Sequence, residues 1–369
     1  MTSLFSPLSL RGLALRNRVV VSPMCQYSAD HGSATPWHLL HLGSLALSGA
    51  GMLCIEATAV EADGRISPAD LGLWNDANAA ALVPVLAAIR AHSRVPVTMQ
   101  LAHAGRKASC EVPWRGGHQL PSGDGGWTTC APSPLTMRPG ESLPIALDTA
   151  GLARVRDAFA AAARRADRLG IDGLEVHAAH GYLLHQFLSP VANQRSDGYG
   201  GSLANRMRFP LEVFEAVRAA FPADKPVGVR VSATDWLDGG WDLEQTIALV
   251  RELAQRGVDW IDASSGGISP HQKIAIGPGY QVPFAEAIKR ATGVPTIAVG
   301  MITEPAQAEA IIAGGQADLV ALARAMLYDP HWPWHAAAAL GATVDAPPQY
   351  WRSAPAEHTG LFGDTRAPR

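Results

Sequence analysis

Cysteine is scarce in this chain of 369 residues, and no two of its cysteines have the spacing of a metal or redox site. The four cysteines lie at positions 25, 54, 110 and 130, so no C-x₂-C pair is present. This number is also small for a disulfide scaffold. We therefore expect a protein of a reducing compartment.

Targeting and membrane signals are also missing. The segment from Met1 to Arg18 has no apolar stretch with a small-residue cleavage site, so we expect no signal peptide. The most apolar long stretch, Leu45–Val60, contains Glu56 and two glycines and is not a membrane span. The formal net charge of −3 gives no basic footprint for nucleic acid or anionic lipid. These absences predict a cytoplasmic protein without nucleic-acid or membrane partners.

The G-x-G-x-x-G fingerprint of dinucleotide-binding sheets occurs nowhere in the sequence, although 47% of the residues are apolar and can fill a large core. Short runs rich in Val, Ile and Leu alternate with longer alanine-rich amphipathic segments. The predicted strands are Arg18–Ser22, Met52–Ala57, Val97–Leu101, Gly173–Val176, Val227–Val231, Trp260–Ala263, Thr296–Val299 and Leu319–Leu322. The clearest predicted helices are Thr149–Leu169, Leu243–Gln255 and Pro305–Ala313. This rhythm predicts an α/β fold, a closed (β/α)₈ TIM barrel, rather than an open doubly wound sheet.

Two regions interrupt this alternation of predicted strands and helices. Residues 103–147, after the third predicted strand, are rich in Gly and Pro and lack periodicity, so we expect a lid-like insertion at the barrel mouth. The C-terminal tail, residues 330–369, is rich in Trp and Pro. Because internal repeats and low-complexity tracts are absent, residues 1–369 are predicted to form one barrel domain.

The segment after the fourth predicted strand carries the most suggestive side chains, because catalytic groups of such barrels lie at the carboxyl ends of strands. His177 and His180 are three residues apart, so we expect a helical turn that places both imidazoles on one face, followed by Tyr182. Two N–H donors on one oxygen polarise a carbonyl and stabilise enolate charge, and a protonated phenol can donate a proton. The alternatives are a structural histidine pair and a zinc site, although no further ligand has convincing spacing nearby.

The same H-x-x-H spacing occurs at His38 and His41, inside the first predicted helical segment. We interpret this pair as core or helix-packing histidines. The spacing alone is therefore weak evidence of function, and the position after a strand is what favours His177 and His180.

Other predicted strand ends carry groups that suit a phosphate and a flavin. Loops after the last two barrel strands often bind phosphate, so Gly300 would allow close backbone approach and Arg324 would add a charged contact. Arg230 and Gln100 would lie beside the pyrimidine edge of a flavin, where a cation stabilises negative charge. The alternative for Arg324 is a surface ion pair, and for Arg230 a barrel-rim ion pair. Cys25, in a loop, would be able to touch a cofactor, although a lone cysteine is more often inert.

Six segments of the sequence form a recognisable set. They are Ser22-Pro-Met-Cys25-Gln-Tyr27, Gln100-Leu-Ala-His-Ala-Gly-Arg-Lys107, Glu175-Val-His177-Ala-Ala-His180-Gly-Tyr182, Ser196-Asp-Gly-Tyr-Gly-Gly-Ser-Leu-Ala-Asn205-Arg206, Val229-Arg230-Val-Ser232 and Ala321-Leu-Ala-Arg324. Over nearly the whole chain, this set resembles the old yellow enzyme family, and within it the bacterial subclass that includes xenobiotic reductases. Singly, only the His–His–Tyr stretch and the Asp-Gly-Tyr-Gly-Gly-Ser run are distinctive.

The resemblance implies a barrel that binds FMN and no metal ion, with NADPH as reductant and NADH as an alternative. The flavin and ribityl contacts that it implies are Ser22, Pro23, Met24, Cys25, Ala57, Gln100 and Arg230. The implied contacts of the phosphate end are Gly300, Met301, Ala323 and Arg324. The implied substrate contacts are Tyr27, His177, His180, Tyr182 and Trp351. Cys25 would tune the flavin, and Met301 stands where some relatives carry a bulky aromatic side chain.

The reaction that the resemblance implies is the reduction of an activated alkene. NAD(P)H would reduce FMN and leave, and an α,β-unsaturated carbonyl or nitro compound would take its place. His177 and His180 would polarise the carbonyl while hydride passes from flavin N5 to Cβ and Tyr182 protonates Cα. Because both compounds share one site, the two half-reactions would alternate with ping-pong kinetics.

The tail carries a further implication. The segment Pro348-Gln-Tyr-Trp351-Arg352 resembles one that reaches into a neighbouring subunit's site in this subclass. Trp351 would then line that subunit's pocket, and Arg352 would lie near its cofactor. The resemblance therefore predicts a homodimer or homotetramer.

Three other functions fit the sequence less well. Related barrels with an iron–sulfur cluster need a cysteine cluster after the barrel, and no cysteine follows Cys130. A flavin-free phosphate-binding barrel, such as an aldolase or isomerase, is disfavoured because no predicted strand end carries a lysine for a Schiff base. A non-catalytic flavin-binding protein is disfavoured because binding alone does not require two histidines and a tyrosine to converge.

Overall fold

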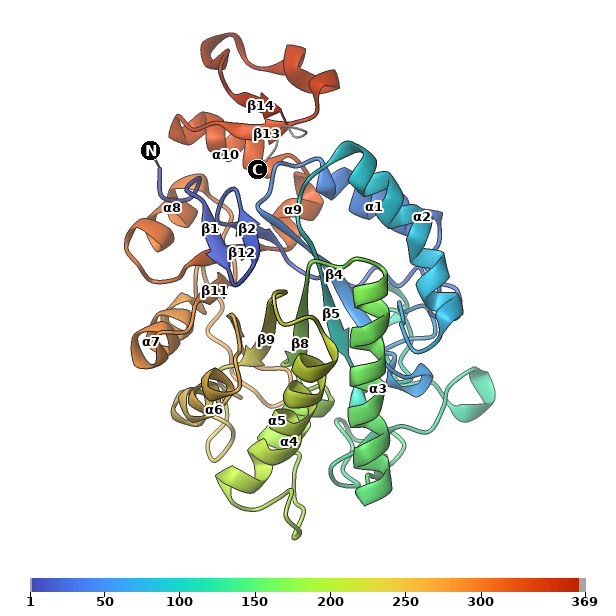
Figure 1. Ribbon diagram of the computed structural model, residues 1–369. Helices are drawn as coiled ribbons and strands as arrows, with labels where there is room; N and C mark the ends of the chain where they lie inside the picture. Colours follow the sequence, from blue (N-terminus) through green and yellow to red (C-terminus); the bar gives the residue numbers. More distant parts are fainter. Residues whose placement is uncertain (1, 365–369) are drawn as a thin grey trace.

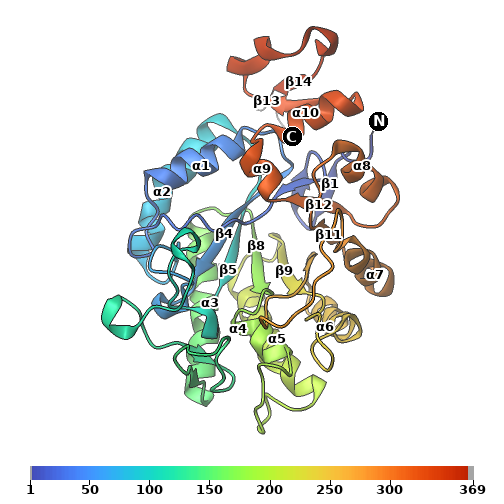
Figure 2. The same cartoon turned by 180° about the vertical axis from the view of Figure 1, so that it is seen from behind.

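The computed structural model describes residues 2–364 and contains a closed barrel of parallel strands inside a layer of helices (Figures 1 and 2). Around the barrel the strands follow the order β3-β4-β5-β8-β9-β10-β11-β12, and β12 pairs with β3 to close it. The barrel strands are β3 (Val19–Val21), β4 (Met52–Ala59), β5 (Val97–Ala102), β8 (Gly173–Ala178), β9 (Val227–Ser232), β10 (Ile261–Ser264), β11 (Thr296–Val299) and β12 (Leu319–Leu322). The predicted (β/α)₈ barrel is confirmed.

Helices between the strands form the outer layer of the barrel (Figure 1). They are α1 (Pro36–Ala46), α2 (Asp76–His92), α3 (Thr149–Arg168), α5 (Leu203–Ala220), α6 (Leu243–Gln255), α7 (Val282–Thr292) and α8 (Pro305–Ala313). Short polar side chains fix where several of them begin. Asp148 before α3 and Asp242 before α6 each accept a backbone N–H of the first helical turn, as N-cap residues do.

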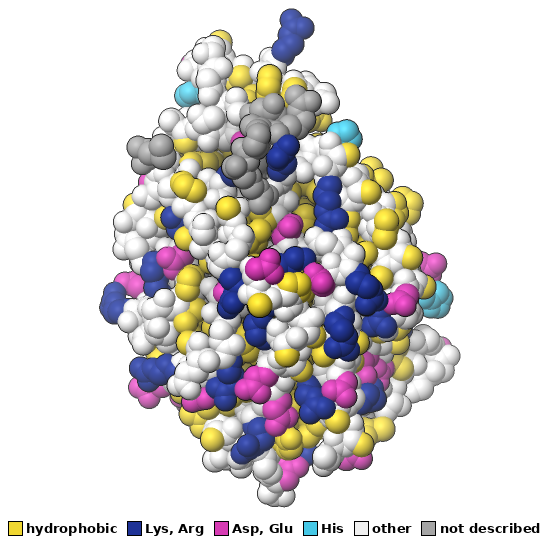
Figure 3. All heavy atoms as spheres, in the orientation of Figure 1, with side chains coloured by type: hydrophobic (Ala, Val, Ile, Leu, Met, Phe, Trp, Pro, Cys, Tyr) yellow, Lys and Arg dark blue, Asp and Glu magenta, His cyan; other side chains and the backbone are white. Residues whose placement is uncertain are grey.

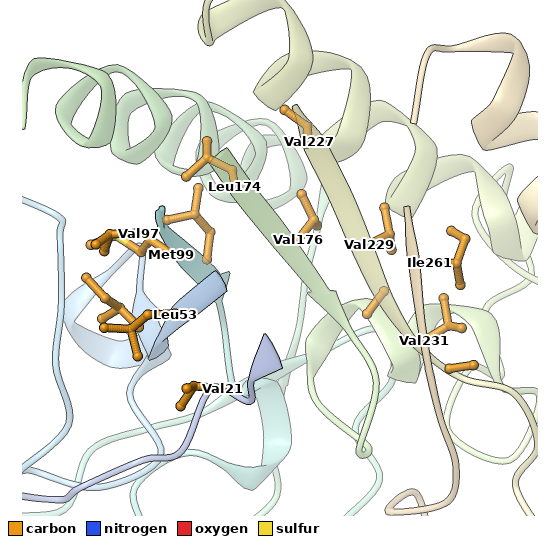
Figure 4. Close-up of a cluster of buried hydrophobic side chains, with 14 of the residues drawn as sticks. Val21, Leu53, Val97, Met99, Leu174, Val176, Val227, Val229, Val231 and Ile261 are labelled. Atoms are coloured by element: carbon orange, nitrogen blue, oxygen red, sulfur yellow. The ribbon is translucent and has the colours of Figure 1, made fainter. Parts of the chain in front are cut away.

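The barrel strands turn apolar side chains outward, against the helices. Val227, Val229 and Val231 of β9 belong to the buried cluster whose strand residues are shown in Figure 4. Successive residues of a strand point to opposite faces, so Arg230 of the same strand points into the barrel. The side chains at the alternate strand positions therefore point into the barrel interior, and several of them are polar.

A hairpin that the sequence did not predict closes the amino end of the barrel. It consists of β1 (Leu8–Leu10) and β2 (Leu13–Leu15), paired antiparallel (Figure 1). Its leucines pack against Met52, Trp260 and Leu319 in an apolar cluster separate from the one under the helices. This plug leaves the carboxyl end as the open mouth of the barrel.

Residues 103–147 form an extension between β5 and α3 that contains only short elements, and it projects from the side of the barrel in Figure 1. These elements are the 3₁₀ turns η2 (Gly105–Lys107), η3 (Pro113–Arg115) and η4 (Ser122–Asp124) and the strands β6 (Cys130–Ala131) and β7 (Ile145–Ala146). A further turn, η1 (Ala62–Gly64), follows β4. The role of the extension as a lid stays a prediction.

Helix α9 (Arg324–Tyr328) follows β12, and the tail after it packs outside the ring of helices, as both ribbon views show. The elements of the tail are α10 (Trp332–Leu340), β13 (Val344–Ala346), η5 (Pro348–Ser353), η6 (Ala356–His358) and β14 (Phe362–Asp364). Aromatic contacts hold them together. The ring of Trp334 stacks on His331 with centroids 3.9 Å apart and meets Phe362 at 5.0 Å.

The surface carries charges of both signs. On the face in Figure 3, Lys and Arg side chains alternate with Asp and Glu without a large patch of one sign. This mixture agrees with the small net charge of the chain. No helix among residues 2–364 is both long enough and apolar enough to cross a bilayer.

Candidate functional site

Three rings meet at the carboxyl end of β8. His177 is only 3% exposed, and its ring lies edge-on to those of His180 and Tyr182. The ring centroids are 5.1 Å apart in each of the two pairs. The structure therefore brings together the three residues predicted to bind and protonate a substrate.

The backbone that joins these rings differs from the helical turn predicted from the sequence. His177 belongs to β8, and the chain then turns sharply, with φ of +59° at His180 and +74° at Gly181. Helix α4 (Leu183–Leu188) begins only after Tyr182. A residue other than glycine adopts positive φ only when its surroundings hold it there. The predicted helical turn is wrong, and a strand end followed by a left-handed residue brings the imidazoles together.

Residues at the ends of the next two barrel strands, and in the loop after β10, hold this turn. The N–H of His180 donates to Ser232 Oγ over 2.9 Å, and His180 Nε2 lies 2.7 Å from Ser264 Oγ. Gly267, with φ of +98°, lies so close that a Cβ added there would be 2.4 Å from the carbonyl carbon of His180. Residues on or just after β9 and β10 thus fix the position of His180.

Burial sets the protonation states of the three rings. Desolvation, reinforced by the positive charge of Arg230, holds the pKa values of His177 and His180 well below the ordinary value. Both imidazoles are therefore neutral at pH 7, and each has one N–H. Burial raises the pKa of Tyr182 well above its ordinary value, so the phenol keeps its proton. The site offers neutral N–H donors beside a phenolic proton.

Polar side chains fill the barrel interior around these rings. Gln100 Nε2 donates to Glu175 Oε1 over 2.8 Å, and Trp260 Nε1 donates to Glu175 Oε2 over 3.1 Å. Arg230 Nε lies 3.3 Å from Asp262 Oδ2, so Arg230 does form a barrel ion pair. Burial raises the pKa of the Asp262 carboxyl, while the positive charge of Arg230 opposes this rise. Gln100 and Arg230 flank β8 on β5 and β9, rather than facing each other across the mouth.

A cavity of about 800 Å³ opens beside these groups. Its lining includes five residues predicted to contact FMN, namely Arg230, Gly300, Met301, Ala323 and Arg324. This volume lies within the usual range of cofactor and ligand sites. No carboxylate among residues 2–364 forms an ion pair with Arg324, so the surface ion-pair alternative finds no support.

Glycine is required at the wall of this cavity. The backbone has φ of +120° at Gly300, and a Cβ there would lie 2.8 Å from Gln281 Nε2. Met301 follows with φ of +51°, and its side chain is 37% exposed. The strained pair Gly300-Met301 thus turns the chain after β11 around the cavity.

The loop after β3 reaches the same end of the barrel. Tyr27 has φ of +49°, and its ring meets Trp114 of the extension edge-on with centroids 5.8 Å apart. Burial and the nearby Asp70 carboxylate raise the pKa of Cys25, which therefore remains a thiol. Cys25 and Tyr27 both raise the pKa of Tyr182, which places them near that phenol. The other predicted cofactor contacts at this end are Ser22, Pro23, Met24 and Ala57.

Several buried polar atoms at the mouth have no hydrogen-bond partner among residues 2–364. They include Ser22 Oγ and His177 Nδ1, and Arg230 Nε has only its ion-pair contact of 3.3 Å with Asp262. Buried polar atoms without a hydrogen bond are costly, so these atoms indicate a polar ligand at the mouth. A flavin offers acceptors and donors along one edge, and the cavity that extends to Gly300 and Arg324 has room for its phosphate tail. The residues present therefore fit FMN.

One cluster of possible metal ligands lies elsewhere, at Glu61, Asp63 and His103. Arg154 already supplies a cation there, because its Nη1 lies 2.7 Å from Glu61 Oε1. His103 Nδ1 accepts the N–H of Gly105, so the ring proton is on Nε2, which faces Glu61 at 3.4 Å. The guanidinium of Arg154 thus already partners the carboxylate of Glu61 in this cluster.

The second histidine pair lies on α1. His38 is fully buried, its Nδ1 accepts the N–H of Thr35 over 3.0 Å, and its Nε2 faces Glu56 Oε1 at 3.4 Å. His41 is half-buried, and burial together with His38 lowers its pKa to about 4. The interpretation of this pair as core and helix-packing histidines is confirmed.

The tail residues assigned to a neighbouring subunit lie on η5. Trp351 is 41% exposed, and its Nε1 donates to the carbonyl of Ala346 over 3.0 Å. Arg352 is exposed beside it. Neither residue lines the cavity at Arg324 of its own chain. Their placement in a partner's site, and the oligomer it requires, stay predictions.

Sequence reasoning assigned no role to four residues that shape the site. Lys107 and Glu175 lie inside motifs that were recognised, but neither received a role. Asp262 and Ser264 lie two residues apart on β10, and this spacing points both into the barrel. The period-2 pattern of polar residues in β8, β9 and β10 was the signal that could have identified them.

Comparison with known proteins places the chain in a family. It matches the model of the NADH:flavin oxidoreductase / NADH oxidase family over residues 3–342. It is 43% identical to an NADPH dehydrogenase of Geobacillus thermodenitrificans, over 95% of this chain and 98% of that protein. An NADH:flavin oxidoreductase of Gibberella zeae is 44% identical, over 85% of this chain and 80% of that protein.

Solved structures agree with this placement. Morphinone reductase has a TM-score of 0.76 at 29% identity, covering 99% of this chain and 94% of its own. A 2-naphthoyl-CoA reductase complex has a TM-score of 0.82 at 25% identity, covering 92% of this chain and 52% of its own. The resemblance to the old yellow enzyme family is confirmed. The chain belongs to the NADH:flavin oxidoreductase / NADH oxidase family and is an FMN-dependent oxidoreductase.

Proposed function

We propose that this protein is an ene reductase that uses NADPH to reduce the C=C bond of α,β-unsaturated carbonyl compounds, with nitroalkenes as related substrates. The observation that carries the proposal is the convergence of His177, His180 and Tyr182 at the barrel mouth. NADPH is supported by relatives named NADPH dehydrogenases, which are 41–43% identical to this chain. A solved complex of morphinone reductase with tetrahydroNAD shows that a nicotinamide binds to that related barrel.

The two histidines are proposed to hold the carbonyl oxygen. Neutral imidazoles donate N–H groups without protonating the oxygen. These hydrogen bonds strengthen as enolate charge develops on the oxygen. His177 is buried and His180 is fixed by Ser232 and Ser264, so both donors are oriented before substrate arrives. FMN, when bound, supplies the hydride that none of these side chains can supply.

Tyr182 is proposed to deliver the proton. Its O–H bond breaks, a C–H bond forms at Cα, and the negative charge remains on the phenol oxygen until solvent reprotonates it. The raised pKa keeps the proton on the oxygen until the alkene has become carbanion-like. Tyr27 lies near this phenol, and its ring contacts Trp114 of the extension.

The proposal is tested by separating the two half-reactions. The FMN-loaded protein is titrated with NADPH without dioxygen until the flavin absorbance bleaches, and 2-cyclohexenone is then added. We expect the oxidised absorbance to return, with one cyclohexanone formed for each flavin reoxidised. A matched control, 2-cyclohexenol, retains the C=C bond but lacks the carbonyl, and it should leave the flavin reduced.

Two outcomes would contradict the proposal. Bleaching by NADPH without reoxidation by enones, nitroalkenes or maleimides would indicate a flavin-binding protein or an oxidoreductase for other acceptors. Equal reoxidation by the enone and the allylic alcohol would show that the histidines do not act on a carbonyl.

A further inference from the structure

Lys107 lies at the end of η2, in the extension that follows β5, and its ammonium group reaches the histidine site. Its Nζ donates to the carbonyl of His180 over 2.7 Å and to the carbonyl of Gly267 over 3.1 Å. The same Nζ lies 5.0 Å from the centroid of the Tyr182 ring, over its face. An ammonium has three donors, and here two bind carbonyls while the cation faces an aromatic ring.

The two carbonyls belong to backbone segments that are strained and in close contact. His180 has φ of +59° and Gly267 has φ of +98°. A Cβ on Gly181 would lie 2.0 Å from the carbonyl oxygen of Gly267, so the segments after β8 and β10 touch through their backbones. Buried carbonyl groups are normally paired with a donor. Lys107 donates to both of these carbonyls and so clamps the two segments together.

The cation also has an electrostatic consequence for Tyr182. When the phenol gives its proton to a substrate carbon, its oxygen and ring take up negative charge. An ammonium above the ring attracts this charge strongly, because the surroundings are poor in water. The same cation helps to keep His177 and His180 neutral, since it is among the groups that lower their pKa values.

We propose that Lys107 is a positioning residue that clamps His180 in its left-handed turn and holds a cation over the Tyr182 ring, where it stabilises the phenolate left after proton transfer. This inference rests on the proposed ene reduction. Under this proposal, the proton-transfer step depends on the charge of Lys107, which touches neither the flavin nor the alkene.

The charged and titratable groups around Lys107 come from both sides of it. They are Arg106, Cys110, Arg138 and Glu141 of the extension, and His177, His180 and Tyr182 of the barrel. Burial, followed by the repulsion of Arg138, lowers the pKa of Lys107 to about 8. Burial raises the pKa of Cys110 to about 11 and moves those of the barrel groups away from 8. As pH rises through about 8, Lys107 therefore loses its charge while Cys110, His177, His180 and Tyr182 keep their protonation states.

The test compares three variants in the enone half-reaction. Lys107→Gln keeps N–H donors but has no charge, Lys107→Arg keeps the charge at all working pH values, and Lys273→Gln removes an exposed lysine as a matched control. We expect wild-type reoxidation by 2-cyclohexenone to slow above pH 8. Lys107→Gln should be slower by roughly 30-fold at pH 7 and should lack this pH dependence. Lys107→Arg should restore the rate and also lack the fall above pH 8, and Lys273→Gln should match wild type.

Flavin reduction by NADPH serves as the internal reference, because it involves no proton from Tyr182. A wild-type protein that the enone does not reoxidise would overturn the proposed function itself. A wild-type protein that reacts, with Lys107→Gln equally fast and showing the same pH profile, would overturn only the role of Lys107.

A second readout needs neither FMN nor substrate. The chain has only four lysines, at positions 107, 225, 273 and 289, so ¹⁵N-lysine labelling gives few ammonium signals in NMR spectra. The Nζ of Lys107 should exchange its protons slowly, since it donates to two carbonyls, and its signal should titrate near pH 8 and vanish in Lys107→Gln. A Lys107 signal that exchanges as fast as that of Lys273 would contradict the clamp.

Discussion

His38 and His41 have the same spacing as His177 and His180, but they lie on a helix rather than at the end of a strand. On α1, His38 Nδ1 accepts the N–H of Thr35, and His38 Nε2 lies 3.4 Å from a buried carboxylate oxygen of Glu56. At the end of β8, His177 Nδ1 has no partner among residues 2–364, and His180 Nε2 lies 2.7 Å from the neutral hydroxyl of Ser264. A buried carboxylate beside the ring, rather than the spacing of two histidines, distinguishes the structural pair from the candidate site.

The surrounding charges also differ between the two regions. The pair on α1 faces an acidic group, Glu56, whereas Arg230 and Lys107 surround the pair after β8. Cations keep buried imidazoles neutral, and neutral imidazoles bind an oxygen without protonating it.

Tyr182→Phe should have the largest effect. The ring that contacts His177 is preserved and only the phenolic proton is lost, so enone-dependent reoxidation of the reduced flavin should fall by about 100-fold or more. Reduction by NADPH should change little. Stopped-flow absorbance measures both rates, and an unchanged enone rate would mean that solvent or another residue supplies the proton.

His177→Ala should lower kcat/KM for 2-cyclohexenone by roughly 100-fold, because one oriented donor to the carbonyl oxygen is lost. His41→Ala is the matched control from the other pair and should leave kcat/KM unchanged. Steady-state assays at saturating NADPH measure both variants. Equal kcat/KM values for the two variants would remove the distinction between the pairs.

Gly267→Ala should disturb the site through the backbone of His180. The new Cβ would lie 2.4 Å from the His180 carbonyl carbon, so the turn must shift, and kcat/KM for the enone should fall about tenfold or more. Gly293→Ala is the control, since Gly293 also has positive φ but no atom lies within 4 Å of its added Cβ. An equal activity loss in both variants would attribute the effect to general destabilisation.

His38→Ala should have the smallest effect on alkene reduction and a large effect on stability. It leaves the carboxylate of Glu56 buried beside an empty space, so the free energy of unfolding should fall by about 3 kcal/mol. Urea unfolding followed by circular dichroism measures this change. A variant as stable as wild type would show that the buried pair contributes nothing to the fold.

The barrel could be predicted from the sequence because its signals are local. The apolar runs of the strands and the amphipathic helices between them repeat along the chain, and helices such as Leu243–Gln255 have the bounds that their periodicity gives. The hairpin that closes the amino end was missed because each of its strands, such as Leu8–Leu10, is only three residues long. Such a short strand has no readable period.

The site was only partly predictable, because distant residues set its geometry. The left-handed turn at His180 depends on Ser232, Gly267 and Lys107, which lie far from it in the sequence. Neither the propensity of His180 nor its spacing from His177 contains that information. Its identity as a functional residue could be predicted, but its conformation could not.

The central claim, that the histidine pair after β8 acts on an activated alkene, is tested most directly by reoxidising the NADPH-reduced protein with either 2-cyclohexenone or dioxygen. Dioxygen needs no donor to a carbonyl, so it reports on the flavin alone. The ratio of the enone rate to the dioxygen rate should fall by roughly 100-fold in His177→Ala and stay at the wild-type value in His41→Ala. A ratio that is the same in wild type and His177→Ala would contradict the account.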